Sequence, residues 1–296
     1  MPPRPYLQVD VFSKRPGCGN PLAVVLDAEG LTSEQMQTIA GWTNLVETTF
    51  VLPPTQPDAD YRVRIFTPQR EIPFAGHPSL GTAHALLASK RIHKQNGEIV
   101  QECGAGLIPI RIETSKKFRR RLFFRAPAVK NIQPYNDSVI EAKTVFSGMA
   151  LGLLSPSLVE GGRKWWIAEM RDESALRDLK PDHAAITAMS KASDSMGLCV
   201  FSRCTDQDYQ LAVRAFAPAF GIKEDPASGA ANATIAAYLL DSGALESIGH
   251  NYRVSQGREI GHDATIDLRA AAQDDIWVGG ECQTVISGNM NWIDNP

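Results

Sequence analysis

The sequence predicts an α/β (α+β) protein of two pseudo-symmetric domains, each a strand-rich sheet or barrel wrapped around a central apolar helix. A chain of 296 residues is long enough for two domains of about 150 residues, each with its own interior. The segment YRVRIFTP at 61–68 is echoed by LAVRAFAP at 211–218, with Val, Arg, Phe and Pro in register. The separation of the two segments is half the chain, which indicates an internal repeat.

Each copy of the repeat is followed by a short loop and then by a helix of small and apolar residues, at 79–88 and at 229–240. A helix that is apolar on all sides cannot lie on a surface, so each must be enclosed by the sheet of its own half. We therefore expect an N-terminal domain at 1–124, to which 284–296 returns, and a C-terminal domain at 125–283.

Local patterns assign the individual elements. Alternation at 7–12, a glycine- and proline-rich turn, and an apolar run at 22–26 predict a hairpin. Thr32 and Gln35 form a capping box before a helix that we expect to end near Gly41. The other β-prone runs lie at 45–52, 61–66, 164–168, 252–255, 264–268, 276–279 and 282–286. The basic cluster Lys116–Arg121 is expected to be a solvated turn.

Composition excludes several classes of function. The apolar share of 43% and charged share of 21% are those of a globular protein. A net charge of −3 provides no positive field for nucleic acid. No apolar run long enough to span a membrane and no signal sequence occur, so we expect a cytoplasmic protein without membrane contact. Five scattered cysteines, dispersed histidines and the lack of nucleotide-binding motifs predict no metal and no cofactor.

Glu47 is the first candidate for chemistry, because strand periodicity places it on the same face as Leu45, Thr49 and Val51. A carboxylate in this setting has two interpretations. It is either a solvated strand residue, or an enclosed group whose pKa is raised by its apolar neighbours into the range useful for acid and base catalysis.

Two polar turns precede the apolar helices, Gly76-His77-Pro78 in the first half and Asp225–Gly229 in the second. The start of a helix presents unpaired N–H groups and a positive dipole end, which suit a carboxylate or an oxyanion. The alternative is that Ser79, and Asp225 or Ser228, are only helix caps. A pseudo-twofold arrangement would bring both helix starts to one small-molecule cleft between the domains, where His77 could orient the substrate or exchange a proton with Glu47.

These motifs together resemble the PhzF family of phenazine-biosynthesis isomerases. The matching segments are Asp10-Val11-Phe12, Gly19–Val25, Glu47–Val51, Phe66-Thr67-Pro68, Glu71, Pro73–Pro78, Gly104-Ala105-Gly106 and Glu224–Gly229. The resemblance implies a diaminopimelate-epimerase-like fold, often in a homodimer, and a proton transfer between ring carbons without a cofactor. It also implies that Glu47 is the acid and base and that His77 and Asp225 are polar active-site residues. By the same resemblance, the substrate would contact Asn20, Ser228 and Ala230, with backbone donors at Gly76 and Gly229.

The sequence departs from its fold relatives at informative positions. Racemases and epimerases of this fold use a cysteine in each half, but the corresponding positions here are Ala75 and Pro226-Ala227. Many family members have serine where this chain has Ala230, which bears on the identity of the substrate. We expect a cofactor-independent isomerase acting on a small carboxylate-bearing substrate, with a dihydroaromatic acid as one possibility. A non-catalytic binding protein and an amino-acid racemase or epimerase are the alternatives.

Overall fold

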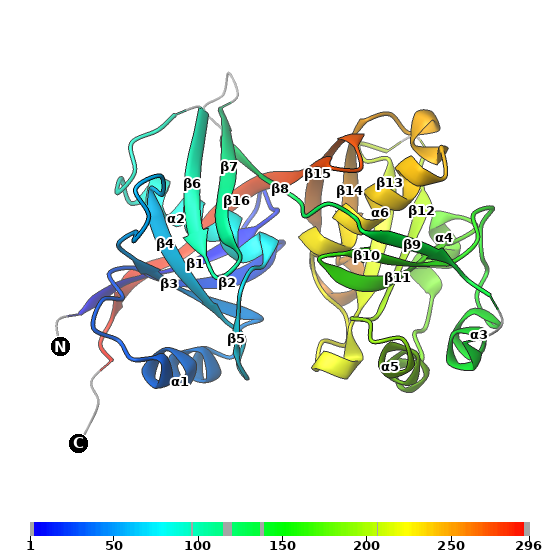
Figure 1. Cartoon of the computed structure of the whole chain (residues 1–296), viewed down its shortest axis with the longest axis horizontal. Helices are drawn as coiled ribbons and strands as arrows, with labels where there is room; N and C mark the ends of the chain where they lie inside the picture. Colours follow the sequence, from blue (N-terminus) through cyan, green and yellow to red (C-terminus); the bar gives the residue numbers. More distant parts are fainter. Residues whose placement is uncertain (1–2, 96, 115–119, 137–138, 206, 293–296) are drawn as a thin grey trace. The chain divides into compact units, whose positions relative to one another are not determined.

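The computed structural model describes residues 3–95, 97–114, 120–136, 139–205 and 207–292 (Figure 1). The chain divides into two compact units, Met1–Arg125 with Gly279–Pro296, and Ala126–Val278. Each unit is described by itself. No helix within the described segments combines the length and apolar character needed to cross a membrane.

The first unit is a closed barrel of eight strands. Hydrogen bonds join neighbouring strands around the barrel, and β1 pairs with the last strand, β16, to close it. In barrel order the strands are β1 (Arg4–Val11), β2 (Asn20–Val25), β3 (Glu47–Leu52), β4 (Tyr61–Phe66), β6 (Gly97–Cys103), β7 (Gly106–Thr114), β8 (Arg120–Arg125) and β16 (Asp275–Met290). The short strand β5 (Glu71–Ile72) pairs with β4.

Helix α2 (Gly76–Ala88) fills this barrel, with all but two of its residues buried. It contacts β1, β2, β3 and β8, and a side chain at Gly81 would overlap Leu22 and Val11. Helix α1 (Ser33–Thr43) also belongs to this unit, and Thr32 and Gln35 form the predicted capping box at its start.

The second unit repeats the plan with an open sheet. Its strands in order are β9 (Asn131–Pro134), β10 (Ser157–Gly161), β11 (Arg163–Glu169), β12 (Leu198–Arg203), β13 (Leu211–Phe216), β14 (Asn251–Gln256), β15 (Ala264–Ala272) and the beginning of β16. The buried helix α6 (Gly229–Asp241) packs against β10, β11, β12 and β15. The remaining helices are α3 (Ile140–Phe146), α4 (Glu173–Asp178), α5 (His183–Ala192) and the 3-10 turns η1 (Pro218–Phe220), η2 (Ala244–Ser247) and η3 (Arg258–Ile260).

The internal repeat is visible in the strand pairing. Strand β4 is antiparallel to β3 and parallel to β6, and β13 is antiparallel to β12 and parallel to β14. Both β4 and β13 lead through a loop into the central helix of their unit. The predicted fold class, two similar halves each enclosing an apolar helix, is thereby confirmed.

Some predicted elements differ from the structure. Helix α1 continues past Gly41 to Thr43, because the left-handed residue that ends it is Asn44, with φ of 52°. The runs at 276–279 and 282–286 are parts of a single strand, β16. Of the basic cluster, residues 116–119 lie outside the described part of the chain, whereas Arg120 and Arg121 begin β8.

Candidate active site

Glu47 is an enclosed carboxyl group. It is the first residue of β3, where it pairs with Leu22 of the parallel strand β2, and it is only 8% exposed. The two residues that follow it, Thr48 and Thr49, are fully buried. The interpretation of Glu47 as a solvated strand residue is therefore wrong.

His77 lies against Glu47. It is the second residue of α2 and 7% exposed, and its Nε2 atom is 3.2 Å from Oε2 of Glu47. Burial lowers the pKa of the His77 imidazole from 6.5 to about 3, so the ring is neutral at neutral pH. A neutral imidazole with its proton on Nε2 can donate a hydrogen bond to a carboxylate. In the other tautomer, Nε2 can accept a hydrogen bond from a carboxylic acid.

The start of α2 carries backbone amides without acceptors among the described residues. Its N-cap residue, Ala75, supplies no side-chain cap, and the Ser79 hydroxyl donates back to the Ala75 carbonyl, so Ser79 is not the cap that one interpretation expected. Within the described segments the amides of Gly76 and His77 have no acceptor, which leaves the positive end of the helix available. Residue 76 must be glycine here, because a Cβ atom would overlap the ring of Phe124.

Asn20 belongs to the same region of the first unit. It begins β2 and is completely buried. Asn20 lies two residues before Leu22, the partner of Glu47, and alternate residues of a strand share a face. Its side chain therefore points to the side of β2 that carries Leu22.

In the second unit the predicted residues form one turn at the start of α6. The Asp225 amide donates to the Ala215 carbonyl at 2.9 Å, and Asp225 Oδ1 accepts from the Ala227 amide at 3.1 Å. Ser228 is the N-cap, since its Oγ accepts from the Ala231 amide at 3.3 Å. Gly229 is buried and Ala230 is exposed, and neither amide has an acceptor among the residues described.

Sequence reasoning missed Gln256, which fixes both ends of this turn. Gln256 is completely buried at the end of β14. Its Nε2 donates to the Asp225 carbonyl at 2.9 Å, and its Oε1 accepts from the Ser228 amide at 3.2 Å. The residue that follows, Gly257, also lies close to the turn: it has φ of 92°, and a Cβ there would lie 2.6 Å from the Pro226 carbonyl oxygen.

The structure thus gathers the predicted residues into two sets. Glu47, His77 and Gly76 lie together at the start of α2, with Asn20 on the adjoining strand. The second set, Asp225, Ser228, Gly229 and Ala230, lies at the start of α6.

Comparison with known proteins assigns the family. The family model described as "Phenazine biosynthesis-like protein" (PhzC-PhzF) matches residues 9–288. The chain belongs to the PhzF family. It is 33% identical over 274 residues to the trans-2,3-dihydro-3-hydroxyanthranilate isomerase of Pseudomonas chlororaphis, covering 91% of each chain. It is 34% identical over 291 residues to "Antisense-enhancing sequence 1" of Schizosaccharomyces pombe, covering 96% of this chain and 97% of the other.

Solved structures agree with this membership. A PhzF-family protein of Bacillus anthracis superposes with a TM-score of 0.83 at 25% sequence identity, over 99% of this chain and all of the other. The resemblance drawn from the motifs is confirmed, and the protein is an isomerase of the PhzF family.

Proposed function

We propose that this PhzF-family isomerase moves a proton between two carbons of a small carboxylate-bearing substrate, and that Glu47 acts first as base and then as acid. The observation that carries the proposal is the buried contact between Glu47 and His77, with Oε2 and Nε2 3.2 Å apart. An acid or base must be sheltered and held in place to transfer a proton to carbon efficiently.

The proposed reaction has two proton transfers. The Glu47 carboxylate removes an acidic C–H proton, and the electron pair left on carbon spreads into the conjugated system of the substrate as an enolate-like charge. The resulting Glu47 carboxylic acid then returns the proton to a different carbon. No atom or electron is gained or lost overall, so the reaction needs no oxidant, reductant or co-substrate.

His77 suits both stages of this cycle. Because burial lowers its pKa to about 3, the ring stays neutral and does not compete for the proton. With its proton on Nε2, the ring can donate to Oε2 of the Glu47 carboxylate, and it can donate to the same oxygen as the carbonyl of the carboxylic acid when Oε1 carries the transferred proton. The side chain of Glu47 therefore keeps a partner in the same position before and after proton transfer.

The starts of the two helices supply the binding groups in this proposal. The Gly76 amide in the first unit, and the Gly229 and Ala230 amides in the second, are each suited to a substrate carboxylate or to a developing enolate-like charge. Asn20 in the first unit, and Asp225 and Ser228 in the second, are the candidate side chains for polar contacts to substrate. These assignments are supported by the open amides at both helix starts.

A dihydroaromatic acid is the substrate class that we propose, because the Pseudomonas relatives are named for trans-2,3-dihydro-3-hydroxyanthranilate. A dihydroaromatic acid offers a ring C–H at the end of a diene that is conjugated with the carboxylate, so that loss of this proton gives the enolate-like charge that the mechanism requires. Ala230 carries a methyl group where many family members have the hydroxyl of a serine. A substrate with one polar group fewer opposite residue 230 is therefore favoured.

The test is Glu47→Gln, with trans-2,3-dihydro-3-hydroxyanthranilate as the probe. Removing the acid and base should lower kcat by about two to four orders of magnitude, while calorimetry should show binding within a few-fold of wild type. Glu102→Gln is the matched control, since Glu102 is also a buried carboxyl of the first unit, 7% exposed, but its partners are Thr55 and the Gln56 amide. Turnover of the probe by Glu47→Gln at the wild-type rate would refute the assignment.

Two assays of the wild-type protein with the same probe separate the alternatives: the chirality of the product, and the incorporation of solvent deuterium. A racemase would invert a stereocentre and needs a base on each side of the carbon, whereas Ala75 in the first half and Pro226-Ala227 in the second stand where the resemblance would place cysteines. A binding protein without activity would introduce no solvent deuterium into the probe.

A further inference from the structure

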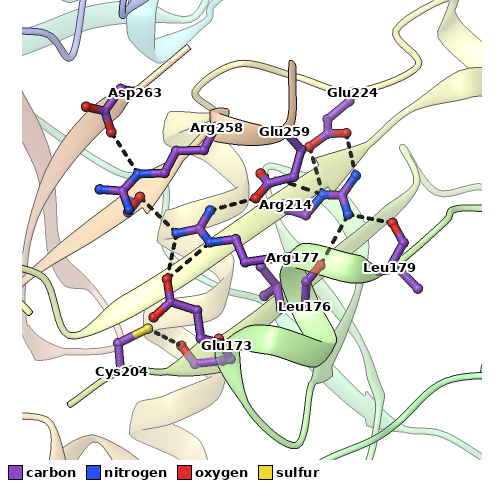
Figure 2. A network of polar contacts seen from close by, with 12 residues as sticks. Glu173, Leu176, Arg177, Leu179, Cys204, Arg214, Glu224, Arg258, Glu259 and Asp263 are labelled. Atoms are coloured by element: carbon purple, nitrogen blue, oxygen red, sulfur yellow. Dashed lines mark hydrogen bonds and ion pairs between the residues drawn. The ribbon is translucent and has the colours of Figure 1, made fainter. Parts of the chain in front are cut away.

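A buried ion pair includes Glu224, the residue that precedes the Asp225 turn in the chain. Arg214 of β13 donates from Nε and Nη2 to the two carboxylate oxygens of Glu224, at 2.9 and 2.8 Å. The two side chains are 5% and 7% exposed. Figure 2 shows this pair within a wider network of the second unit. Two parallel bonds from a planar guanidinium fix direction as well as distance.

The pair is linked to the proposed site through one peptide bond. Glu224 precedes Asp225, and the Asp225 amide donates to the carbonyl of Ala215, the residue that follows Arg214 in β13. Strand β13 thus holds the first residues of the turn by two contacts, the ion pair of Arg214 with Glu224 and the main-chain hydrogen bond from Asp225 to Ala215. Gln256 holds the far end, through the Asp225 carbonyl and the Ser228 amide.

Arg214 is itself fixed from the other side. Its Nη1 donates to the carbonyls of Leu176 and Leu179, at 3.2 and 2.7 Å, where α4 ends. A cation is favoured at the C-terminus of a helix, which carries the negative end of the dipole. The guanidinium also lies over the ring of Phe216, 5.1 Å from its centre.

The remaining charges of the network are largely paired with one another (Figure 2). Arg177 bonds to Glu259 at 2.9 Å and to Glu173 at 3.0 Å. Glu259 is 3.9 Å from Arg214, well beyond the two bonds to Glu224. Glu224 is therefore the main counter-charge of Arg214.

The internal repeat contains an equivalent arginine–glutamate pair in the first unit. Arg64 of β4 donates to Glu71 at 2.7 and 2.6 Å and lies over Phe66, again 5.1 Å from the ring centre. Arg64 and Arg214 occupy the same position in the repeated motif, and each glutamate lies in the segment between the strand and the central helix. The pair in the first unit is 26% and 42% exposed, so only the second is removed from water.

We propose that Arg214 is a positioning residue, which sets the place of Asp225 and of the start of α6 through its ion pair with Glu224. The inference rests on the proposed function for the importance of Asp225. A buried ion pair is a poor source of stability, because desolvation of the charges offsets their attraction. The two parallel bonds of the Arg214–Glu224 pair, and its position next to Asp225 in the chain, instead support a role in fixing the geometry of the turn.

The test compares single and paired substitutions in the whole protein. Arg214→Met and Glu224→Leu alone should each lower stability, because each leaves an uncompensated buried charge. The double variant, Arg214→Met with Glu224→Leu, should recover most of that stability. It should still exchange the amide protons of Asp225, Ala227 and Ser228 at least about tenfold faster than wild type, measured by hydrogen exchange and mass spectrometry.

Two further variants keep the result interpretable. Arg214→Lys retains the charge but cannot form both parallel bonds, so it should fold and still speed exchange of the same amides. Arg64→Met with Glu71→Leu removes the exposed counterpart and should leave exchange at 225–228 unchanged. With trans-2,3-dihydro-3-hydroxyanthranilate as probe, Arg214→Lys should lower kcat at least about tenfold more than this control does.

The outcomes separate this proposal from the proposed function. Wild-type exchange and wild-type kcat in Arg214→Lys would overturn the positioning role and leave the role of Glu47 intact. Faster exchange in Arg214→Lys, together with unchanged turnover in Glu47→Gln, would overturn the catalytic assignment and support the control of the turn by Arg214.

Discussion

Replacement of His77 by glutamine should reduce the fall in the free energy of unfolding that occurs as the pH is lowered. The folded protein keeps His77 neutral down to a pKa of about 3, whereas a histidine in the unfolded chain takes up a proton near pH 6.5. Between these values the unfolded state binds more protons than the folded state, so the free energy of unfolding falls as the pH falls. The contribution is present above pH 6.5 and is lost progressively toward pH 3.

The magnitude follows from the difference between the two pKa values. Each pH unit within the window lowers the unfolding free energy by about 1.4 kcal/mol, which gives about 2 kcal/mol between pH 6.5 and pH 5. An ionised Glu47 3.2 Å away favours the protonated ring and opposes this loss, so the figure is an upper limit. The pH slope of stability, rather than stability at one pH, isolates the titration of His77.

Urea unfolding at pH 7, 6 and 5, followed by circular dichroism, measures this slope. Wild type should lose up to about 2 kcal/mol more than His77→Gln between pH 7 and pH 5. His250→Gln is the control, because it makes the same substitution at a side chain that is 45% exposed. Equal slopes for wild type and His77→Gln would refute the neutral, buried state of the imidazole.

Two other predictions concern packing around the site and the cysteines. Gly76→Ala should destabilise the protein by about 1–3 kcal/mol, because the added Cβ overlaps the ring of Phe124. Urea unfolding measures the loss, Phe124→Leu in the same chain should recover part of it, and unchanged stability in Gly76→Ala would contradict the tight contact. Burial raises the pKa of the Cys282 thiol to about 12, so iodoacetamide at pH 8 should label Cys282 only after denaturation. Labelling of Cys282 in the native protein as fast as in urea would show that the thiol is accessible.

The fold class was predictable because its evidence is local and occurs twice. The repeated strand motif and the two apolar helices each carry their own pattern, and the pairing of β4 and β13 agrees with them. The capping box at Thr32 was also readable, since both partners lie within one helical turn. The end of α1 was predicted within two residues: Gly41 suggested a stop, and the residue that adopts the left-handed conformation after the helix is Asn44.

The site was predictable as a set of residue types but not as contacts. Glu47 and His77 are 30 positions apart in the sequence, and only the packing of α2 inside the barrel brings their atoms to 3.2 Å. Gln256 could not be found, because a buried glutamine has no local pattern and its partners lie about 30 residues away. Arg214 was noticed only as a marker of the repeat, since its pairing with Glu224 depends on the course of the loop.

The central claim, that one enclosed carboxyl removes and returns the same proton, is tested most directly by isotope transfer. The substrate is trans-2,3-dihydro-3-hydroxyanthranilate carrying deuterium at the ring carbon that loses its proton, and the reaction is run in ordinary water. A measurable share of the deuterium should appear at the carbon that gains a proton, because Glu47 is only 8% exposed and exchanges slowly with the solvent. A product in which every transferred position carries solvent hydrogen, from the first turnovers onward, would contradict the single-carboxyl mechanism.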